Sequence, residues 1–390
     1  MKKQIYLICI SLLGLGAVSC QKEKMTSEPT LSRVPIVGTA RTPETKGAPR
    51  LNGLGDLADQ DFGLSAWYTP EGSEFGQGST LYIANHRFGT LDNINWQGIS
   101  KGPEGKSLDP VYYPLDGSLS FFCYAPYRDN SEFRDIVFDN DPPESITSRM
   151  DDYLPGSPLI KFTPEKETKD QIDFMAANPV LNWGRRQGDI PVDFALHLTT
   201  KVQLHCKVRG AVNDEERIII SNVTLKDIIG SEYLYFTKEG DALIHKWCND
   251  ISPADGSSSM PRTEYELSIE NGALSNASLN TDSFTYINET PVGDMYLLPQ
   301  VFKDEDGTAD PGKYPQQLWI DYQIFNGDGI VESNTLKYEL RGTEAWPSGK
   351  MVAYYITLDI AVRKDLIVET VVLKDWDNAQ NTHNPEEILY

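Results

Sequence analysis

The sequence predicts an all-β protein, because apolar and polar residues alternate along several long runs and turn signals separate the runs. Every second residue is apolar in Leu119–Ala125, Val202–Val208 and Leu318–Ile324, which is the period of a strand that buries one face. Pairs such as Asp116-Gly117 and Glu239-Gly240 stand between runs and are typical of tight turns. Few long stretches follow the helical period, so we expect a sandwich of antiparallel strands.

The N-terminus predicts export. A basic start precedes an apolar run, Ile5–Val18, and the small residue Ser19 stands directly before Cys20. This is the order of parts in a secretory signal, and the apolar run is too short to span a bilayer as a stable helix. The end of the run also resembles a bacterial lipoprotein signal, which implies that residues 1–19 are removed and that Cys20 carries lipid. A plain cleaved signal is the alternative.

Residues 20–50 are expected to form a lipid anchor, a tether and a short strand, and a resemblance to a known family, carried by five later segments, implies that this strand is a cleavable leader. The first part of this region is polar and aperiodic, and Val34–Thr39 then has the composition of a short strand. Arg41, Lys46 and Arg50 follow in a stretch rich in proline and glycine. Because this stretch has no apolar face, we expect it to be exposed and mobile.

The rest of the chain is long enough for two hydrophobic cores. A polar link with a glycine, at residues 209–216, separates one strand-like run from the next. We therefore expect an N-terminal β-sandwich over residues 51–210 and a C-terminal β-sandwich over residues 211–390.

Composition limits the partners and excludes a disulfide framework. The chain carries a formal net charge of -22, and an acidic surface repels phosphate backbones, so nucleic acid is not an expected partner. Beyond the N-terminus the cysteines are Cys123, Cys206 and Cys248. Cys123 and Cys206 fall in alternating runs, where free cysteine behaves as a small buried hydrophobe. A single disulfide in an oxidising compartment is the alternative.

No residue pattern predicts catalysis, a metal or a cofactor. His245 and Cys248 are spaced like half of a zinc site, but His205 and Cys206 would point to opposite faces of a strand. The acidic turn at residues 304–310 lacks the ligands of a complete calcium loop. Since no nucleophile signature is present, we do not expect an enzyme.

Several aromatic residues of the first half stand in or near expected loops. Exposed aromatic residues on loops stack on sugars or anchor protein partners, whereas buried ones fill the core of a sandwich. Both interpretations are open for the following residues: Trp67, Tyr68, Trp96, Tyr112 and Tyr113.

Five segments carry a resemblance to a known family. They are Tyr113–Tyr127, Asp173–Ala177, Val192–Val202, Tyr296–Gln300 and Trp346–Leu358. In this order, they resemble the fimbrillin family, the subunits of type V pili in Bacteroidales, and its minor-fimbrillin-like relatives. The resemblance implies two transthyretin-like β-sandwich domains in tandem, export as a lipoprotein, and cleavage after Arg or Lys by a trypsin-like protease.

The resemblance also implies how subunits join. Removal of the leader strand leaves a groove, and a strand from the C-terminus of the next subunit fills it by β-augmentation. Arg41, Lys46 and Arg50 are then the candidate processing residues. The candidate donor strand lies in the last segment of the chain, with these residues as candidate plugs: Ile367, Val371, Leu373, Trp376, Ile388, Leu389 and Tyr390.

We therefore predict a structural and adhesive subunit of a cell-surface pilus, held at the cell outer membrane by lipid on Cys20 and joined to other pilus subunits by donor-strand exchange. The alternative is a lipid-anchored surface protein that never polymerises and that binds a glycan or a host protein. Neither function needs a cofactor. The stalk, anchor and tip positions of a pilus all stay open.

Overall fold

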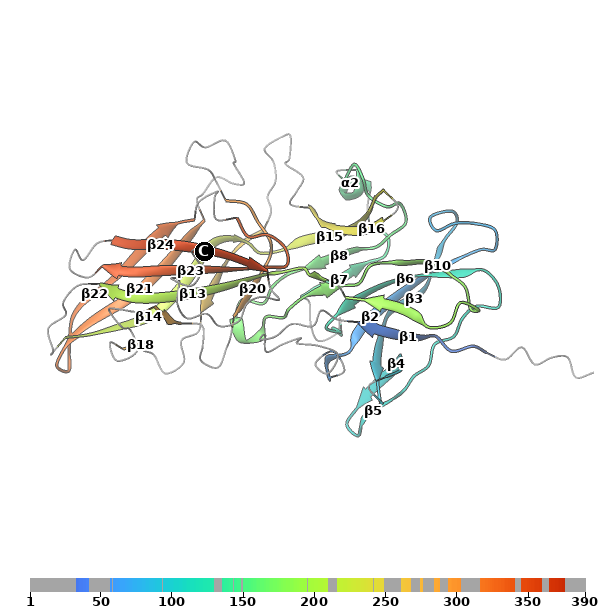
Figure 1. Cartoon of the computed structure of the whole chain (residues 1–390), viewed down its shortest axis with the longest axis horizontal. Helices are drawn as coiled ribbons and strands as arrows, with labels where there is room; N and C mark the ends of the chain where they lie inside the picture. Colours follow the sequence, from blue (N-terminus) through green and yellow to red (C-terminus); the bar gives the residue numbers. More distant parts are fainter. Residues whose placement is uncertain are drawn as a thin grey trace, which may run out of the picture. The chain divides into compact units, whose positions relative to one another are not determined.

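The computed structural model shows an all-β chain, as the alternation predicts (Figure 1). In the part of the chain that the structure describes, no helix combines the length and the apolar character needed to cross a membrane. The described residues are 33–41, 57, 59–92, 94–129, 135–142, 144–148, 150–194, 196–209, 216–240, 242–248, 261–267, 274–275, 284–287, 294–302, 316–340, 345–359 and 365–375.

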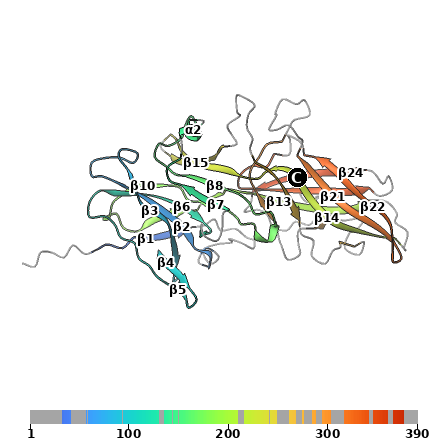
Figure 2. The same cartoon turned by 180° about the vertical axis from the view of Figure 1, so that it is seen from behind.

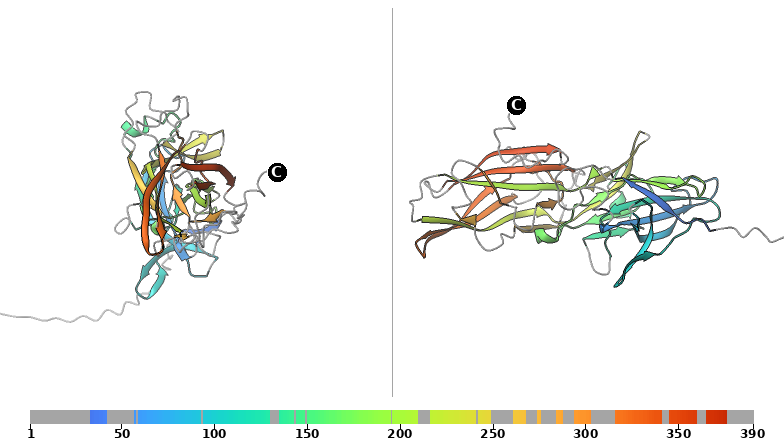
Figure 3. Two further views of the ribbon diagram at one scale, coloured as in Figure 1. Left: turned by 90° about the vertical axis from the view of Figure 1, so that its left-hand side faces the viewer. Right: turned by 60° about the horizontal axis from the view of Figure 1, so that its bottom comes forward.

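A ten-stranded sheet dominates the first half of the chain. Its strands follow the order β11-β1-β4-β3-β2-β6-β9-β12, with β5 paired to β4 and β10 paired to β6. Figure 2 shows β2, β3 and β6 as neighbours, and Figures 1 and 3 show the β4–β5 hairpin projecting away from them. The bounds are β1 (Val37–Arg41), β2 (Phe62–Thr69), β3 (Thr80–Thr90), β4 (Trp96–Gly102), β5 (Gly105–Leu108), β6 (Ser118–Ala125), β9 (Met175–Ala176), β10 (Val180–Trp183), β11 (Ile190–Asp193) and β12 (Leu196–His197).

A four-stranded sheet, in the order β16-β15-β8-β7, brings together two distant segments of the chain. β8 pairs antiparallel with both β7 and β15. Two short helices, α2 and η1, flank β8 in the sequence. The bounds are β7 (Ile136–Asp139), α2 (Glu144–Thr147), β8 (Leu159–Phe162), η1 (Thr168–Asp170), β15 (Glu232–Glu239) and β16 (Ala242–Trp247).

Strand β6 is buried on both faces, although its alternation predicts one buried face. Leu119 and Phe121 belong to one apolar cluster, whereas Phe122 and Tyr124 belong to a second. The four-stranded sheet covers this second face, and the ring of Phe122 lies 5.0 Å from the ring of Phe236 on β15, centroid to centroid. The sequence does not reveal this cover, because β15 follows β6 by more than a hundred residues.

Two five-stranded sheets enclose the apolar cluster of the second half. One has the order β19-β13-β23-β24 with β20 paired to β13, and the other has the order β17-β14-β21-β22 with β18 paired to β14. The predicted alternation of Val202–Val208 and Leu318–Ile324 is confirmed, since the apolar members of both runs point into this cluster. The bounds are β13 (Thr200–Arg209), β14 (Glu216–Ile229), β17 (Arg262–Leu267), β18 (Leu274–Ser275), β19 (Thr285–Tyr286), β20 (Met295–Leu297), β21 (Gln317–Asn326), β22 (Gly329–Glu339), β23 (Lys350–Asp359) and β24 (Asp365–Asp375).

The strand pairing does not follow a single division at residues 210 and 211. β13, which precedes that point, pairs in parallel with β23 across its full length. β15, which follows it, pairs with β8 of the first half. Parallel strands need a long connection, and the chain passes from one five-stranded sheet to the other between β13 and β14.

Candidate functional site

Strand β1 occupies an internal position in the ten-stranded sheet. It pairs antiparallel with β4 at Val37 and Gly38 and parallel with β11 from Gly38 to Arg41. A strand in this position has a neighbour on each edge, so its removal would leave unpaired backbone groups on β4 and on β11.

The residues that precede β1 are hydrogen-bonded as well. The N–H of Ile36 donates to the carbonyl of Val111 at 2.9 Å, and the N–H of Tyr113 donates to the carbonyl of Val34 at 3.0 Å. The expected leader strand, Val34–Thr39, therefore overlaps a segment that is paired along its length. We call the space that residues 34–41 occupy between their neighbours the leader slot.

The leader slot is lined by the apolar cluster of the ten-stranded sheet. Ile36 is fully buried, Ala40 is 8% exposed, and Val34 packs against the same cluster. Thr39 points to the other side of the sheet and is exposed, as the period of two requires. Burial of one isoleucine contributes about 1.5–3 kcal/mol, so the leader is a substantial part of this core.

The candidate processing residues lie at or beyond the end of β1. Arg41 is its last residue and is paired with Asp193 of β11. Lys46, Arg50 and the candidate lipidated residue, Cys20, lie outside the described residues. A cut after any of the three basic residues would break the covalent link between β1 and the strands that follow it. The hydrogen bonds of β1 to its neighbours would remain.

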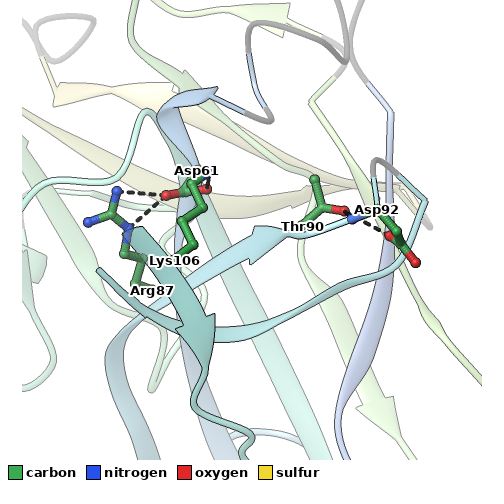
Figure 4. Close-up of polar contacts among 5 residues, drawn as sticks. All are labelled: Asp61, Arg87, Thr90, Asp92 and Lys106. Atoms are coloured by element: carbon green, nitrogen blue, oxygen red, sulfur yellow. Dashed lines mark hydrogen bonds and ion pairs between the residues drawn. The ribbon is translucent and has the colours of Figure 1, made fainter. Parts of the chain in front are cut away.

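A buried charge cluster holds the β4–β5 hairpin next to β2 and β3 (Figure 4). The carboxylate of Asp61 is fully buried, and its Oδ2 lies 2.6 Å from Nη2 and 2.7 Å from Nε of Arg87. Its Oδ1 lies 2.6 Å from Nζ of Lys106. Arg87 is on β3 and Lys106 is on β5, so the cluster fixes the hairpin that supplies β4, one wall of the leader slot.

Hydrogen bonds to Asp92 hold part of the turn between β3 and β4, and Figure 4 shows Asp92 beside Thr90. The carboxylate of Asp92 accepts hydrogen bonds from the backbone N–H groups of Ile94 and Asn95 and from the hydroxyl of Thr90. These bonds favour the ionised form, so they hold the pKa of Asp92 well below its usual range. The turn presents Leu91 and Ile94, which are 53% and 71% exposed.

The candidate donor residues are divided between β24 and the chain beyond it. Ile367, Val371 and Leu373 lie on β24, which pairs antiparallel with β23 from Asp365 to Asp375. The structure therefore places these three residues in a strand of their own sheet. The remaining candidates lie outside the described residues: Trp376, Ile388, Leu389 and Tyr390.

Residues 58–376 match the family model described as fimbrillin-like. The chain belongs to the fimbrillin-like family. Proteins of this family are structural adhesion proteins, which confirms the expectation that the chain is not an enzyme. No curated protein sequence matches the chain.

One solved structure of a fimbrial protein shares the fold of this chain. The chain is 16% identical to a fimbrial protein from Bacteroides vulgatus, with a TM-score of 0.55 over 87% of this chain and 99% of that one. It is 9% identical to the tip fimbrial protein Mfa3 from Porphyromonas gingivalis with a C-terminal truncation, with a TM-score of 0.32 over 88% of this chain and 100% of that one. The similarity to the fimbrial protein from Bacteroides vulgatus supports the fold of this chain and carries no information on its function.

The segments that resemble the fimbrillin family meet in the structure. Nδ1 of His197 lies 2.8 Å from Oδ2 of Asp173, and both residues are buried. The indole Nε1 of Trp346 donates to the hydroxyl of Tyr354 at 2.8 Å. The hydroxyl of Thr200 donates to the carbonyl of Pro347 at 2.7 Å. These polar residues therefore form contacts within and between the segments that carry the resemblance.

The histidines and cysteines singled out in the sequence have structural environments. Cys206 lies in the apolar cluster of the C-terminal sheets, where burial raises the pKa of its thiol to about 12. The ring of His205 stacks on Tyr355 on the opposite face, with centroids 4.6 Å apart. Within the described residues, no three side chains of the His, Cys, Asp or Glu type gather as metal ligands would. The acidic turn at residues 304–310 lies outside them.

The interpretation of the aromatic residues as a loop surface is wrong for the two tryptophans. Trp67 lies on β2 and Trp96 on β4, and they are 4% and 2% exposed. Tyr113 is 8% exposed and belongs to the apolar cluster beneath the leader slot. The aromatic rings fill cores on both sides of the sheet, because the four-stranded sheet covers the face that Trp67 occupies.

Sequence reasoning missed the walls of the leader slot. β11 and the segment at residues 111–113 both contact the leader, yet neither is near it in the chain. Ile190 and Val192 carry a period-two signal for a strand. That signal cannot name the partner strand, because a parallel pair has no short connecting turn to reveal it.

Proposed function

We propose that this chain is a subunit of a cell-surface pilus that is exported as a lipoprotein through Cys20 and assembled after proteolysis by strand exchange at the leader slot. The observation that carries this proposal is the internal position of β1, paired on both edges and linked to the rest of the sheet through a basic stretch. The proposal includes two sandwiches in tandem, with β13 assigned to the second and β15–β16 to the first.

The leader slot has the properties of an acceptor for a foreign strand. It offers backbone partners on β4 and β11 and at residues 111–113, and backbone hydrogen bonds supply affinity in β-augmentation. It also offers an apolar surface, which contacts every second residue of the bound strand. A protein that has lost its leader would expose this apolar surface and the unpaired edges of β4 and β11. This exposure favours rapid binding of another strand.

The cleavage site is best assigned to Lys46 or Arg50. Arg41 is paired with β11, and a protease cuts most readily where the backbone is exposed and unpaired. A cut after Arg41 would first require the end of β1 to separate from Asp193. A cut after either later residue leaves β1 and its pairing with β11 complete.

The donor strand of this chain is best assigned to the residues after Asp375. Donation of β24 would remove the antiparallel partner of β23 along its whole length. Tyr354 and Leu358 on β23 are fully buried in the core, so the loss of β24 would open the C-terminal sandwich. A donor drawn from residues 376–390 avoids this cost.

One observation favours the non-polymerising alternative: β24 is paired with β23 in the sheet of its own chain. In that case the leader stays in its slot, and the protein acts as a lipid-anchored binding protein. The two functions differ in one measurable property, which is whether the leader can be replaced after cleavage.

Leader replacement is the test of strand exchange. Purified residues 21–390 are cut with Arg- or Lys-specific protease, the new N-terminus is sequenced, and a labelled peptide of residues 33–41 is added. We expect native mass spectrometry to show uptake of the label by cut protein and not by uncut protein. No uptake after a cut, or equal uptake without one, would contradict strand exchange.

A disulfide lock supplies the matched control. Thr39 and Pro191 are paired between β1 and β11 and both are exposed, and paired positions on adjacent strands lie within the Cα separation that a disulfide spans. Thr39→Cys combined with Pro191→Cys should block uptake when oxidised and restore it when reduced. Thr39→Cys alone should behave like the unchanged protein under both conditions.

A further inference from the structure

We infer that the leader slot rejects the C-terminal segment of this same chain and takes a strand from a different subunit, one that brings glycine to the centre of the slot. This inference rests on the proposed function and decides a point that it leaves open, whether the subunit joins copies of itself. Four inward positions carry the argument, and in the leader they are held by Val34, Ile36, Gly38 and Ala40.

The inward side chains of the leader become smaller after Ile36. Ile36 is fully buried, so its position accepts a long aliphatic side chain. Gly38 and Ala40 follow at the next two inward positions. They lie opposite Ile190 and Val192 of β11, which fill the same part of the core and are no more than 1% exposed.

The position of Gly38 is closely packed against β11. A Cβ atom built there would lie 3.3 Å from the carbonyl oxygen of Ile190 and 3.6 Å from Cγ2 of Val192. The oxygen belongs to the backbone of β11, so it cannot turn away as a flexible side chain can. Alanine would require β11 to shift by a few tenths of an ångström, and a larger side chain would add further atoms beside Ile190 and Val192 in a packed core.

The C-terminal segment of this chain offers no match. Residues 366–390 contain no glycine and one alanine, Ala379. If Ala379 took the central position with the strand running as the leader runs, Asp375 and Asp377 would take the two aliphatic positions. In the reverse direction those positions would receive Asn381 and His383.

Every other register places a larger side chain against β11. The register of β24 that aligns Ile367 with the first inward position brings Val371 to the centre, where its branched side chain would add bulk to the close contact with Ile190. Burial of an unpaired carboxylate excludes the Ala379 register just as strongly. The slot thus discriminates by steric and charge exclusion, the repulsive part of a specific interface.

The fitting partner is a strand of another protein with a defined pattern. Its inward residues, at every second position, are two aliphatic residues followed by glycine and alanine. The slot places no restriction on the identity of its outward residues. The slot therefore specifies assembly between different subunits, with this chain as acceptor for one partner and as donor to another.

The experiment compares strands in the exchange assay with cut protein. We expect uptake of the leader peptide, residues 33–41, and at least about tenfold weaker uptake of the same peptide with Gly38→Val. Thr39→Val adds bulk at the adjacent outward position and should leave uptake unchanged. A peptide of residues 365–390 should not be taken up, and cut protein alone should stay monomeric in SDS without boiling.

Each result bears on one of the two claims. Uptake of the Gly38→Val peptide or of the C-terminal peptide at the level of the leader peptide would overturn the inference while supporting strand exchange. A ladder of SDS-resistant oligomers from cut protein alone would do the same. Failure of cut protein to take up even the leader peptide would contradict strand exchange, and the inference would fall with it.

Discussion

Nδ1 of His197 and Oδ2 of Asp173 lie 2.8 Å apart, and both side chains are removed from solvent. His197 ends β12, which pairs with β9 just after Asp173. The next strand along the chain is β13, the first strand of the C-terminal sheets. This bond therefore fixes the end of the ten-stranded sheet at the point where the chain passes to the second half.

Removal of the Asp173 carboxylate should destabilise the protein clearly. Asp173→Ala leaves the buried imidazole without this acceptor, and a buried polar group that loses its partner costs about 1–3 kcal/mol. The free energy of unfolding in urea measures the loss. Asp170→Ala, an exposed aspartate in η1, should change stability by less than about 0.5 kcal/mol. Equal effects of the two substitutions would show that the buried bond contributes nothing specific.

A glycine next to His197 should be indispensable for a different reason. Gly349 has φ +67, and a Cβ atom added to it would lie 3.0 Å from the carbonyl oxygen of His197. Gly240 has φ +62 and open space around it, so Gly240→Ala measures the cost of the left-handed backbone alone, about 1–2 kcal/mol. We expect Gly349→Ala to cost at least about 1 kcal/mol more in thermal or urea unfolding. A cost no larger than that of Gly240→Ala would contradict the close approach.

The fold class and the strands could be predicted from the sequence because alternation is a local signal. Val202–Val208 and Leu318–Ile324 reveal their buried faces within each run. A strand was expected at Val34–Thr39 from local composition, and the structure places β1 at Val37–Arg41. Family membership followed from the order of short segments, which needs no knowledge of their contacts.

The pairing of strands could not be predicted, because it joins residues that are far apart. Nothing near Gly38 points to Ile190, and nothing near Asp61 points to Arg87 or Lys106. The cover over Trp67 was missed because it comes from β8 and β15, which are themselves separated in the chain. A site made by pairing is therefore visible only in the structure, even when each of its strands is visible in the sequence.

The Asp61 cluster should behave as a charge site and not as a hydrogen-bond site alone. Asp61→Ala leaves Arg87 and Lys106 without their shared counter-charge, and loss of one partner of a buried ion pair costs about 3 kcal/mol or more. It also places alanine at φ 61, which asparagine tolerates better. We expect Asp61→Asn to lower the free energy of unfolding in urea, but by less than Asp61→Ala does. Asp61→Ala within about 0.5 kcal/mol of the unchanged protein would exclude a stabilising role for the cluster.

Histidine 245 should make the protein less stable in mild acid. It lies on β16, and burial lowers its pKa from 6.5 to about 4, because the charged ring loses solvation. The unfolded chain therefore takes up a proton at a higher pH than the folded chain does, so stability falls as pH falls from about 6.5 to 4. His245→Gln removes this pH-dependent loss of stability. The Tm of the variant minus the Tm of the unchanged protein should therefore increase as the pH is lowered from about 6.5 to 4. Above pH 7 the difference should be constant, since the histidine is then neutral in both states. Scanning calorimetry at pH 4, 5, 6, 7 and 8 measures it, and a difference that stays flat down to pH 4 would mean that the ring of His245 is solvated in the folded protein.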